Sequence, residues 1–150
     1  MADYTIRRAQ REDVGAIVHM LADDQLGATR DDPADLEPYL RAFAQIDVDP
    51  NQLLMVVASG DEPVGTLQLT IIPGLARRGA LRGQIEAVRV HSDHRGSGLG
   101  ADLVRWAIDE SRRRGCALVQ LTSDTSRIEA HRFYERLGFV PSHTGFKLKL

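Results

Sequence analysis

The sequence lacks most of the features that would place it in a specialised class. A single cysteine, Cys116, cannot form an intramolecular disulfide, and no cysteine–histidine spacing typical of a zinc site occurs. The longest uninterrupted apolar run, Leu53 to Ala58, is far shorter than a membrane span. The first residues lack the basic and then apolar regions of a signal peptide. We therefore expect a reducing, cytoplasmic compartment and no membrane partner.

An excess of charge of one sign is also absent. The 150 residues carry 19 Lys and Arg against 21 Asp and Glu, which gives a net charge of −2. Without a basic excess to attract phosphate backbones, nucleic acid is not an expected partner. With 43% hydrophobic and 27% charged residues, the chain is too apolar to be disordered. Its length suits one domain that spans residues 1–150.

Hydrophobic periodicity divides the chain into alternating strands and helices. The expected strands are 4–9, 53–58, 64–72, 85–90, 117–122, 139–140 and 146–150, and the expected helices are about 14–21, 35–43, 98–114 and 130–137. The turn at 60–63 makes a β-hairpin of the two strands beside it. This order of elements predicts one mixed α/β domain.

The segment from Val88 to Gly100 lies between an expected strand and an expected helix. A helix N-terminus has unpaired N–H groups and a positive dipole end, so it binds anions. Gly96, Gly98 and Gly100 let a ligand approach the backbone closely. Arg95 adds a cation whose donors suit phosphate. The segment predicts a pyrophosphate site, and the alternative is a tight turn that needs glycine for its geometry alone.

Two nucleotide-binding motifs can be compared with these letters. A P-loop ends in Gly-Lys-Ser/Thr, which residues 99–102 lack. Gly96-x-Gly98-x-x-Ala101 does match the loose dinucleotide fingerprint. That fingerprint should open a βαβ unit, whereas here it follows a hairpin beyond the middle of the chain. A dinucleotide-binding oxidoreductase is therefore a weak alternative.

Two segments together resemble the GNAT superfamily of acetyl-CoA-dependent N-acetyltransferases. Residues 95–100, Arg-Gly-Ser-Gly-Leu-Gly, resemble its R/Q-x-x-G-x-G/A signature, and residues 130–139 resemble its A-x-x-F-Y-E-x-x-G-F signature. The order of elements also matches the family. The resemblance implies a mixed, mostly antiparallel sheet flanked by helices. It also implies a splay between two parallel strands, at 85–90 and 117–122, into which acetyl-CoA binds.

The resemblance further implies which residues contact this co-substrate. Pantetheine would pair with the backbone at Val88 and Val90, and the pyrophosphate would lie on the amides of 95–100. The predicted cofactor-binding residues are Val88, Arg89, Val90, Arg95, Gly96, Ser97, Gly98, Leu99, Gly100 and Arg127. Many family members have Asn where this chain has Arg127. That arginine either reaches a CoA phosphate or is a solvated residue of a first helical turn.

Acetyl transfer to an amine needs a neutral amine, a stabilised oxyanion and a protonated leaving thiolate, but no enzyme nucleophile. Because G-x-S-x-G is absent and Cys116 lies in an expected strand, we expect direct attack in a ternary complex. Glu86 is the predicted base, acting through a water. Period two places it on one face with Val88 and Val90, among apolar neighbours. The alternative is a bulge that turns Glu86 to solvent or into an ion pair.

Tyr134 is the predicted acid, because it matches the F-Y-E segment of the family; by spacing alone it is equally a core aromatic. The resemblance also implies that a backbone N–H near Val88 polarises the thioester carbonyl. A small-molecule or peptide amine is the expected acceptor, and the sequence does not identify it. The loop 73–82 either lines the acceptor site or forms a homodimer interface. A non-catalytic acyl-CoA-binding module is a further alternative, and no metal is expected, because the histidines meet no zinc spacing.

Overall fold

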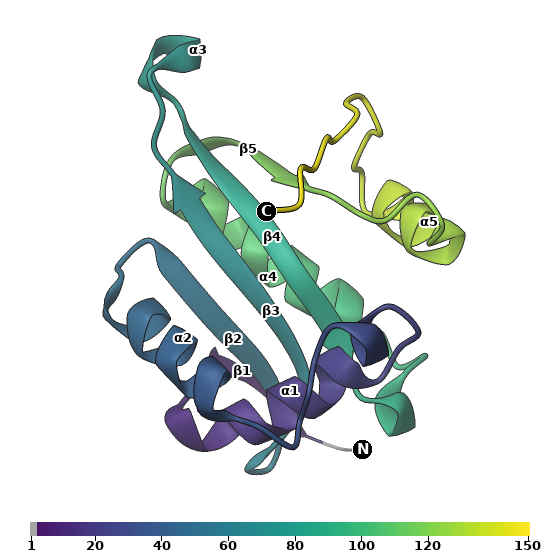
Figure 1. Ribbon diagram of the computed structural model, residues 1–150. Helices are drawn as coiled ribbons and strands as arrows, with labels where there is room; N and C mark the ends of the chain where they lie inside the picture. The colour runs from purple at the N-terminus through teal and green to yellow at the C-terminus, as the bar shows by residue number, and fades with distance from the viewer. Residues whose placement is uncertain (1–2) are drawn as a thin grey trace. The chain divides into compact units, whose positions relative to one another are not determined.

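The computed structural model describes residues 3–150 (Figure 1). They form two compact units that divide after Gln120. The elements of the first unit are β1 (Tyr4–Arg8), η1 (Arg11–Asp13), α1 (Val14–Ala22), η2 (Gly27–Thr29), α2 (Glu37–Val48), β2 (Gln52–Ser59), β3 (Glu62–Ile72), α3 (Ala76–Gly79), β4 (Leu81–Val90), η3 (Ser92–His94), α4 (Leu99–Arg113) and β5 (Cys116–Leu121), whose last residue begins the second unit. The second unit contains α5 (Ile128–Arg136).

The strands form one five-stranded sheet in the order β1-β2-β3-β4-β5. Neighbours from β1 to β4 pair antiparallel, and β4 is parallel to β5. The predicted hairpin is β2 with β3, which extends from Ser59↔Glu62 to Gln52↔Thr70. The prediction of a mixed, mostly antiparallel sheet flanked by helices is confirmed.

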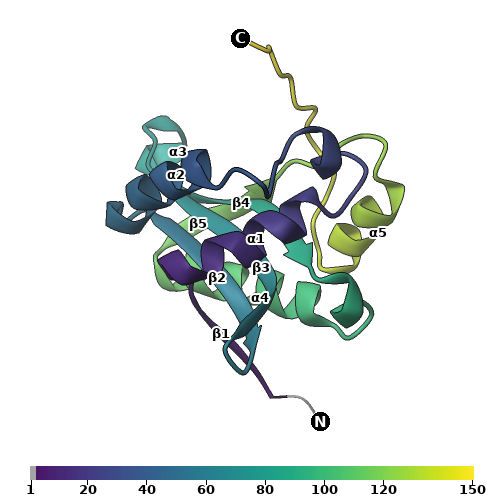
Figure 2. The ribbon, with the colours of Figure 1, turned by 60° about the horizontal axis from the view of Figure 1, so that its bottom comes forward.

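Helices cover both faces of this sheet. Figures 1 and 2 show α1 and α2 on one face and α4 on the other. On the α4 face, Leu67, Leu69 and Ile85 of the sheet are buried with Leu103 and Val104 of the helix. These side chains are the apolar positions that the periodicity of each element predicts.

A second cluster forms the core on the opposite face. It contains Ile17 and Val18 of α1, Phe43 of α2 and Val56 of β2, all buried. Partly buried apolar residues pack around them, among them Tyr39. The core therefore has two layers, with the sheet between them.

Helix α4 packs closely on the sheet at two glycines. A Cβ added to Gly83 of β4 would lie 2.4 Å from Oγ of Ser111, and one added to Gly65 of β3 would lie 3.2 Å from Cδ1 of Leu103. The Ser111 hydroxyl is fully buried and donates to the carbonyl of Ala107 at 2.7 Å. The missing side chains on β3 and β4 leave the space that α4 occupies.

The second unit contains a helix followed by irregular chain. The strands expected at 139–140 and 146–150 are not formed, which corrects that prediction. Alternating apolar residues adopt a strand only where a neighbour supplies hydrogen bonds, and these segments pair with none of the described strands. Val140, Phe146 and Leu148 are consequently exposed.

Other details also differ from expectation, two of them at and before the start of β4. Strand β4 begins at Leu81, whereas the sequence predicted its start at Ile85. Within the expected loop, Ala76–Gly79 forms a short turn in which Arg77 and Arg78 have φ of 57° and 62°. Both differences lie where glycine and arginine interrupt the apolar periodicity.

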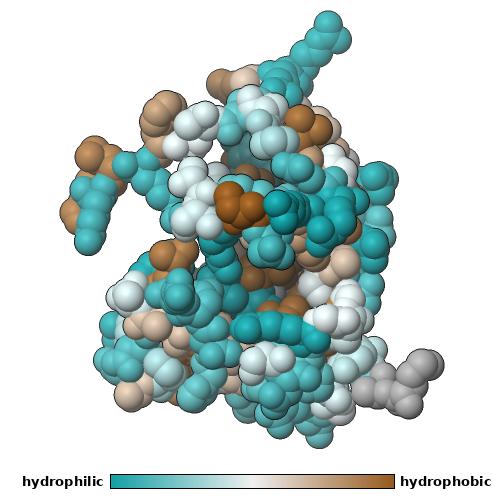
Figure 3. Space-filling view, turned by 90° about the vertical axis from the view of Figure 1, so that its right-hand side faces the viewer, coloured by the Kyte–Doolittle hydropathy of each residue, from teal (hydrophilic) through white to brown (hydrophobic). Residues whose placement is uncertain are grey.

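The surface drawn in Figure 3 is mostly hydrophilic, with apolar residues in separate patches. Within residues 3–150, none of the helices combines the length and the apolar character needed to cross a bilayer.

The contact between Gly83 and α4 predicts a stability effect. Gly83→Ala should lower the free energy of unfolding by about 1–3 kcal/mol, because the added methyl overpacks a closed contact. Adding Ser111→Ala should recover part of the loss, since the nearest atom is the Ser111 hydroxyl oxygen. Gly74→Ala is the matched control, because a Cβ there meets nothing within 4 Å. Urea unfolding of the unchanged protein and the three variants measures the effect, and equal stability of Gly83→Ala and Gly74→Ala would contradict it.

Candidate active site

A β-bulge interrupts β4 in the middle of the predicted site. Arg89 pairs with Thr66 and Glu86 pairs with Gln68, so two residues of β4 lie opposite one residue of β3. The first of the two, Ala87, has a φ of 55°. This left-handed conformation is uncommon for residues other than glycine. The bulge shifts the alternation of side chains along the second half of β4.

The bulge corrects the prediction that Glu86 shares a face with Val88 and Val90. From the register, Glu86 lies on the face of Arg89, whereas Val90 lies on the face of Ile85. The first of these faces carries α1 and α2, and Glu86 is exposed there. The alternative of a bulge that turns Glu86 to solvent therefore describes this strand. The role of Glu86 as base stays a prediction.

The Arg89 side chain forms an ion pair with Asp24 in the loop after α1. Its Nε lies 3.2 Å from Oδ2 of Asp24, and the two side chains are only 13% and 21% exposed. Arg89 also donates to the carbonyl of Val88 at 2.9 Å, and the Asp24 carboxylate accepts the N–H of Gly27. The pair brings the α1–α2 loop onto the face of β4 that carries Glu86. The spacing of the sequence gave no signal for this contact.

The glycine loop, residues 95–100, leads into α4. Gly96 and Gly98 have φ of 79° and 86°, which glycine adopts without a steric penalty. Leu99, the first residue of α4, is buried and fixes the start of the helix in the core. The first-turn amides have no acceptor within the helix, and a Cβ on either glycine would meet nothing within 4 Å. The loop has the geometry that an anion site needs, and pyrophosphate binding stays a prediction.

Arg95 connects this loop to the end of β4. Its Nε donates to the carbonyl of Val90 at 3.2 Å, and its guanidinium lies 3.6 Å from Oδ2 of Asp23. Both charged side chains are more than half exposed, so the ion pair is worth at most about 1 kcal/mol. An anion at the glycine loop can therefore compete for this arginine at little cost.

Strand β5 lies beside only part of β4. Nε2 of Gln120 donates to Oε1 of Gln84 at 2.8 Å, which places the end of β5 beside the first half of β4. The second half of β4, with Val88 and Val90, extends past the end of β5. The backbone on this side of β4 is where a ligand could add hydrogen bonds in the manner of a strand.

Tyr134 and Arg127 lie in the second unit. The ring of Tyr134, on α5, makes edge-to-face contacts with Phe133 and Phe139 at centroid distances of 5.1 and 5.9 Å. Arg127 precedes α5 as its N-cap residue, and its N–H donates to the carbonyl of Asp124 at 3.0 Å. The roles of Tyr134 as acid and of Arg127 as a CoA contact stay predictions.

The one cysteine has the properties of a structural residue. Cys116 begins β5 and is half-buried. Burial raises the pKa of its thiol above the ordinary value, and the nearby charge of Arg114 opposes this only in part. Because the thiolate is the nucleophile, a raised pKa makes Cys116 a poor one at neutral pH.

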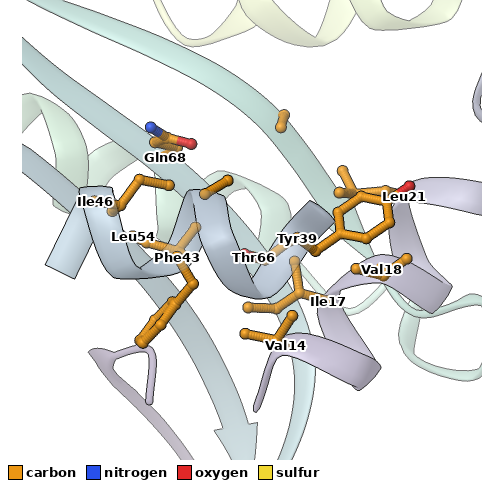
Figure 4. Close-up of a pocket in the computed structure, with 12 residues that line it drawn as sticks. Val14, Ile17, Val18, Leu21, Tyr39, Phe43, Ile46, Leu54, Thr66 and Gln68 are labelled. Carbon is orange, nitrogen blue, oxygen red and sulfur yellow. The ribbon is translucent and has the colours of Figure 1, made fainter. Parts of the chain in front are cut away.

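An apolar cavity that sequence periodicity did not reveal lies between α1, α2 and the sheet (Figure 4). Its volume is about 170 Å³. Periodicity predicts which faces of α1 and α2 are apolar, but not the space that remains between them. Ala87, at the bulge of β4, forms part of the wall.

Comparison with known proteins identifies this architecture. The model of the acetyltransferase (GNAT) family matches residues 16–139. This match covers α1 from residue 16, α2, strands β2 to β5, the glycine loop, α4 and α5. The chain belongs to the acetyltransferase (GNAT) family, and is therefore an acyltransferase. Membership sets aside the alternative of a dinucleotide-binding oxidoreductase.

Three similar proteins define its relationships further. The aminoalkylphosphonate N-acetyltransferase of Salmonella typhimurium is 28% identical over 141 residues, which are 94% of this chain and 88% of that protein. The glucosamine 6-phosphate N-acetyltransferase of Trypanosoma brucei brucei is 38% identical over 87 residues, 58% of this chain and 57% of that protein. A crystal structure from Bacillus halodurans C-125, described as a transcriptional regulator, is 47% identical with a TM-score of 0.95, over 99% of this chain and 100% of that one.

The environment of Cys116 predicts that the thiol takes no part in catalysis. Cys116→Ala should keep the acetyl-transfer rate of the unchanged protein, and the thiol should react with iodoacetamide more slowly at neutral pH than an unburied cysteine. Mass spectrometry of the alkylated protein across pH, together with steady-state rates, measures both. A folded Cys116→Ala variant that loses most of its activity would contradict the prediction.

Proposed function

We propose that the chain transfers an acetyl group from acetyl-CoA to a primary amine, which attacks the thioester directly in a ternary complex. The observation that carries the proposal is the glycine loop at the start of α4. Its two left-handed glycines border open space, and only the short η3 separates the loop from the strand whose second half extends past β5. The GNAT family uses acetyl-CoA as its co-substrate, which supports the assignment.

In this proposal, β4 and the glycine loop bind the co-substrate. The backbone of Val88 and Val90 would pair with pantetheine, and the amides of 95–100 would hold the pyrophosphate with Arg95 beside them. Acetyl-CoA supplies the activated thioester. The N–H of Val88 would polarise its carbonyl, because a donor aimed at the developing oxyanion stabilises the transition state.

The chemistry then needs two proton transfers. Glu86, exposed on β4, would accept the proton of the attacking amine through a water, as a new C–N bond forms. The C–S bond breaks, and Tyr134 would give its hydroxyl proton to the departing thiolate. No step needs a covalent enzyme intermediate, and the raised pKa of the Cys116 thiol favours this direct route.

The acceptor half of the proposal rests on the relatives. Two of them are named for small amines, an aminoalkylphosphonate and glucosamine 6-phosphate. A small-molecule amine is therefore the proposed acceptor class, and a cytoplasmic location stays a prediction. Thiol release from acetyl-CoA with a panel of amines tests the activity.

One result would overturn this activity. Calorimetry that shows CoA binding, together with an absence of thiol release in proportion to added amine, would describe a non-catalytic acyl-CoA-binding module and not a transferase.

The proposed acid predicts a specific kinetic defect. Tyr134→Phe should lower kcat by about 10²-fold with little change in CoA affinity, because only the proton for the leaving sulfur is lost. Tyr4→Phe, which removes a hydroxyl on β1, is the matched control. Rapid-quench and steady-state rates provide the measurement. If chemistry limits turnover and Tyr134→Phe turns over normally, Tyr134 is not the acid.

The proposed base predicts a change in the pH profile. Glu86→Gln should lower kcat/KM by about 10²-fold at neutral pH and should recover rate as alkaline pH deprotonates the amine in solution. Glu62→Gln removes an exposed carboxylate from the neighbouring strand and is the control. The profile of kcat/KM against pH decides. A Glu86→Gln profile that runs parallel to that of the unchanged protein would exclude this base.

A further inference from the structure

The cavity beside the bulge carries information about the acceptor. It lies between α1, α2 and the strands β2, β3 and β4, as Figure 4 shows, and its volume is about 170 Å³. The lining residues, none of them charged, are Val14, Ile17, Val18, Leu21, Tyr39, Ala42, Phe43, Ile46, Leu54, Thr66, Gln68 and Ala87. The wall is therefore aliphatic and aromatic, except for two side chains of β3 and the hydroxyl of Tyr39.

The two polar side chains of β3 already have partners. The Thr66 hydroxyl donates to the carbonyl of Met55 at 2.9 Å. Nε2 of Gln68 donates to Oε1 of Gln52 at 2.9 Å. An occupant that needed these donors would first have to break hydrogen bonds within the sheet, at a cost that an apolar occupant avoids.

The hydroxyl of Tyr39 is engaged as well. It donates to the Asp31 carboxylate at 3.0 Å and accepts the N–H of Asp32 at 2.9 Å. Tyr39 therefore presents its ring to the cavity and its oxygen to Asp31 and Asp32 in the loop before α2. The wall offers an occupant apolar contact and no cation for a phosphate or phosphonate.

The cavity lies next to the proposed base. Ala87 belongs to its wall and is exposed, and the preceding residue, Glu86, is exposed on the same side of the sheet. An acceptor with an ammonium group and an apolar body could place its nitrogen by Glu86 and its body in the cavity. The charge of the carboxylate and the apolar wall match the two ends of such a molecule.

We propose that this cavity is the acceptor subsite and that the acceptor is a primary amine with an unbranched alkyl or aryl body of about six carbons. A dry cavity of about 150 Å³ is known to hold a benzene molecule, which sets this size. The proposal rests on the proposed acetyl transfer. It assigns this chain a different acceptor class from the two phosphorus-containing amines for which its relatives are named.

The test compares n-alkylamines from ethyl to octyl with 2-aminoethylphosphonate. These alkylamines have nearly equal basicity, so differences in KM report burial of the chain and not the fraction of neutral amine. KM should fall about fourfold for each added methylene up to about hexylamine and then rise. A KM independent of chain length, or a phosphonate preferred over hexylamine, would overturn the proposal.

A matched pair of variants locates the effect. Ala42 and Ala44 are both exposed on α2, but only Ala42 lines the cavity. Ala42→Leu should raise the KM for hexylamine about 15- to 60-fold and leave that for ethylamine unchanged, because the new side chain takes the space of two or three methylenes. Ala44→Leu should change neither value. Equal effects of the two variants would contradict the assignment.

A binding measurement separates this inference from the activity on which it rests. Calorimetric titration of hexylamine should show binding that Ala42→Leu weakens and Ala44→Leu does not. Such binding without thiol release would refute acetyl transfer to these amines and leave the cavity as an amine site. Thiol release with polar amines, without hexylamine binding, would refute the cavity assignment and keep the transferase. Failure of both measurements would overturn both proposals.

Discussion

The left-handed residue Ala87 is the constraint on which the site depends. Without the bulge, regular alternation would place Glu86 and Arg89 on opposite faces of the sheet, so one of them would lie on the α4 side. With it, both side chains reach the face covered by α1 and α2. Arg89 then holds the Asp24 loop, and Glu86 stays accessible beside the cavity. One residue in an unusual conformation thus places a carboxylate, an ion pair and a cavity wall on the same side.

The elements that the sequence predicted well are those whose ends are marked by glycine, proline or charged residues. Helix α4 begins after Gly98 and ends before Gly115, and three arginines stand in its last turn and just after it. The hairpin of β2 and β3 has a turn rich in glycine and proline between two apolar runs. The prediction of strands at 139–140 and 146–150 was wrong, because it rested on alternation alone. Their alternation is clear in the sequence, but a strand also needs a hydrogen-bonded neighbour, and spacing carries no information about that neighbour.

The candidate site divides in the same way. The glycine loop could be read from its letters, because only glycine takes up positive φ without penalty and exposes a helix N-terminus. The bulge could not, since alanine gives no sign that it adopts φ of 55°. The pairing of Asp24 with Arg89 joins segments far apart in the chain, and the cavity is a space between side chains. Both depend on how the helices settle on the sheet, which is decided by packing of the whole core.

The close packing of α4 on the sheet has a consequence at the N-terminal end of that helix. Its 15 residues make a stiff rod of about 22 Å. Ser111, near the C-terminal end of α4, packs against the sheet at Gly83. Leu103, in the first half of the helix, packs against it at Gly65. Two such contacts fix both the distance of the helix from the sheet and its inclination to the sheet. These two glycines, in β3 and β4, therefore set the position of the amides of the glycine loop at the start of α4. The contact at Gly83 does so from most of the length of the helix away.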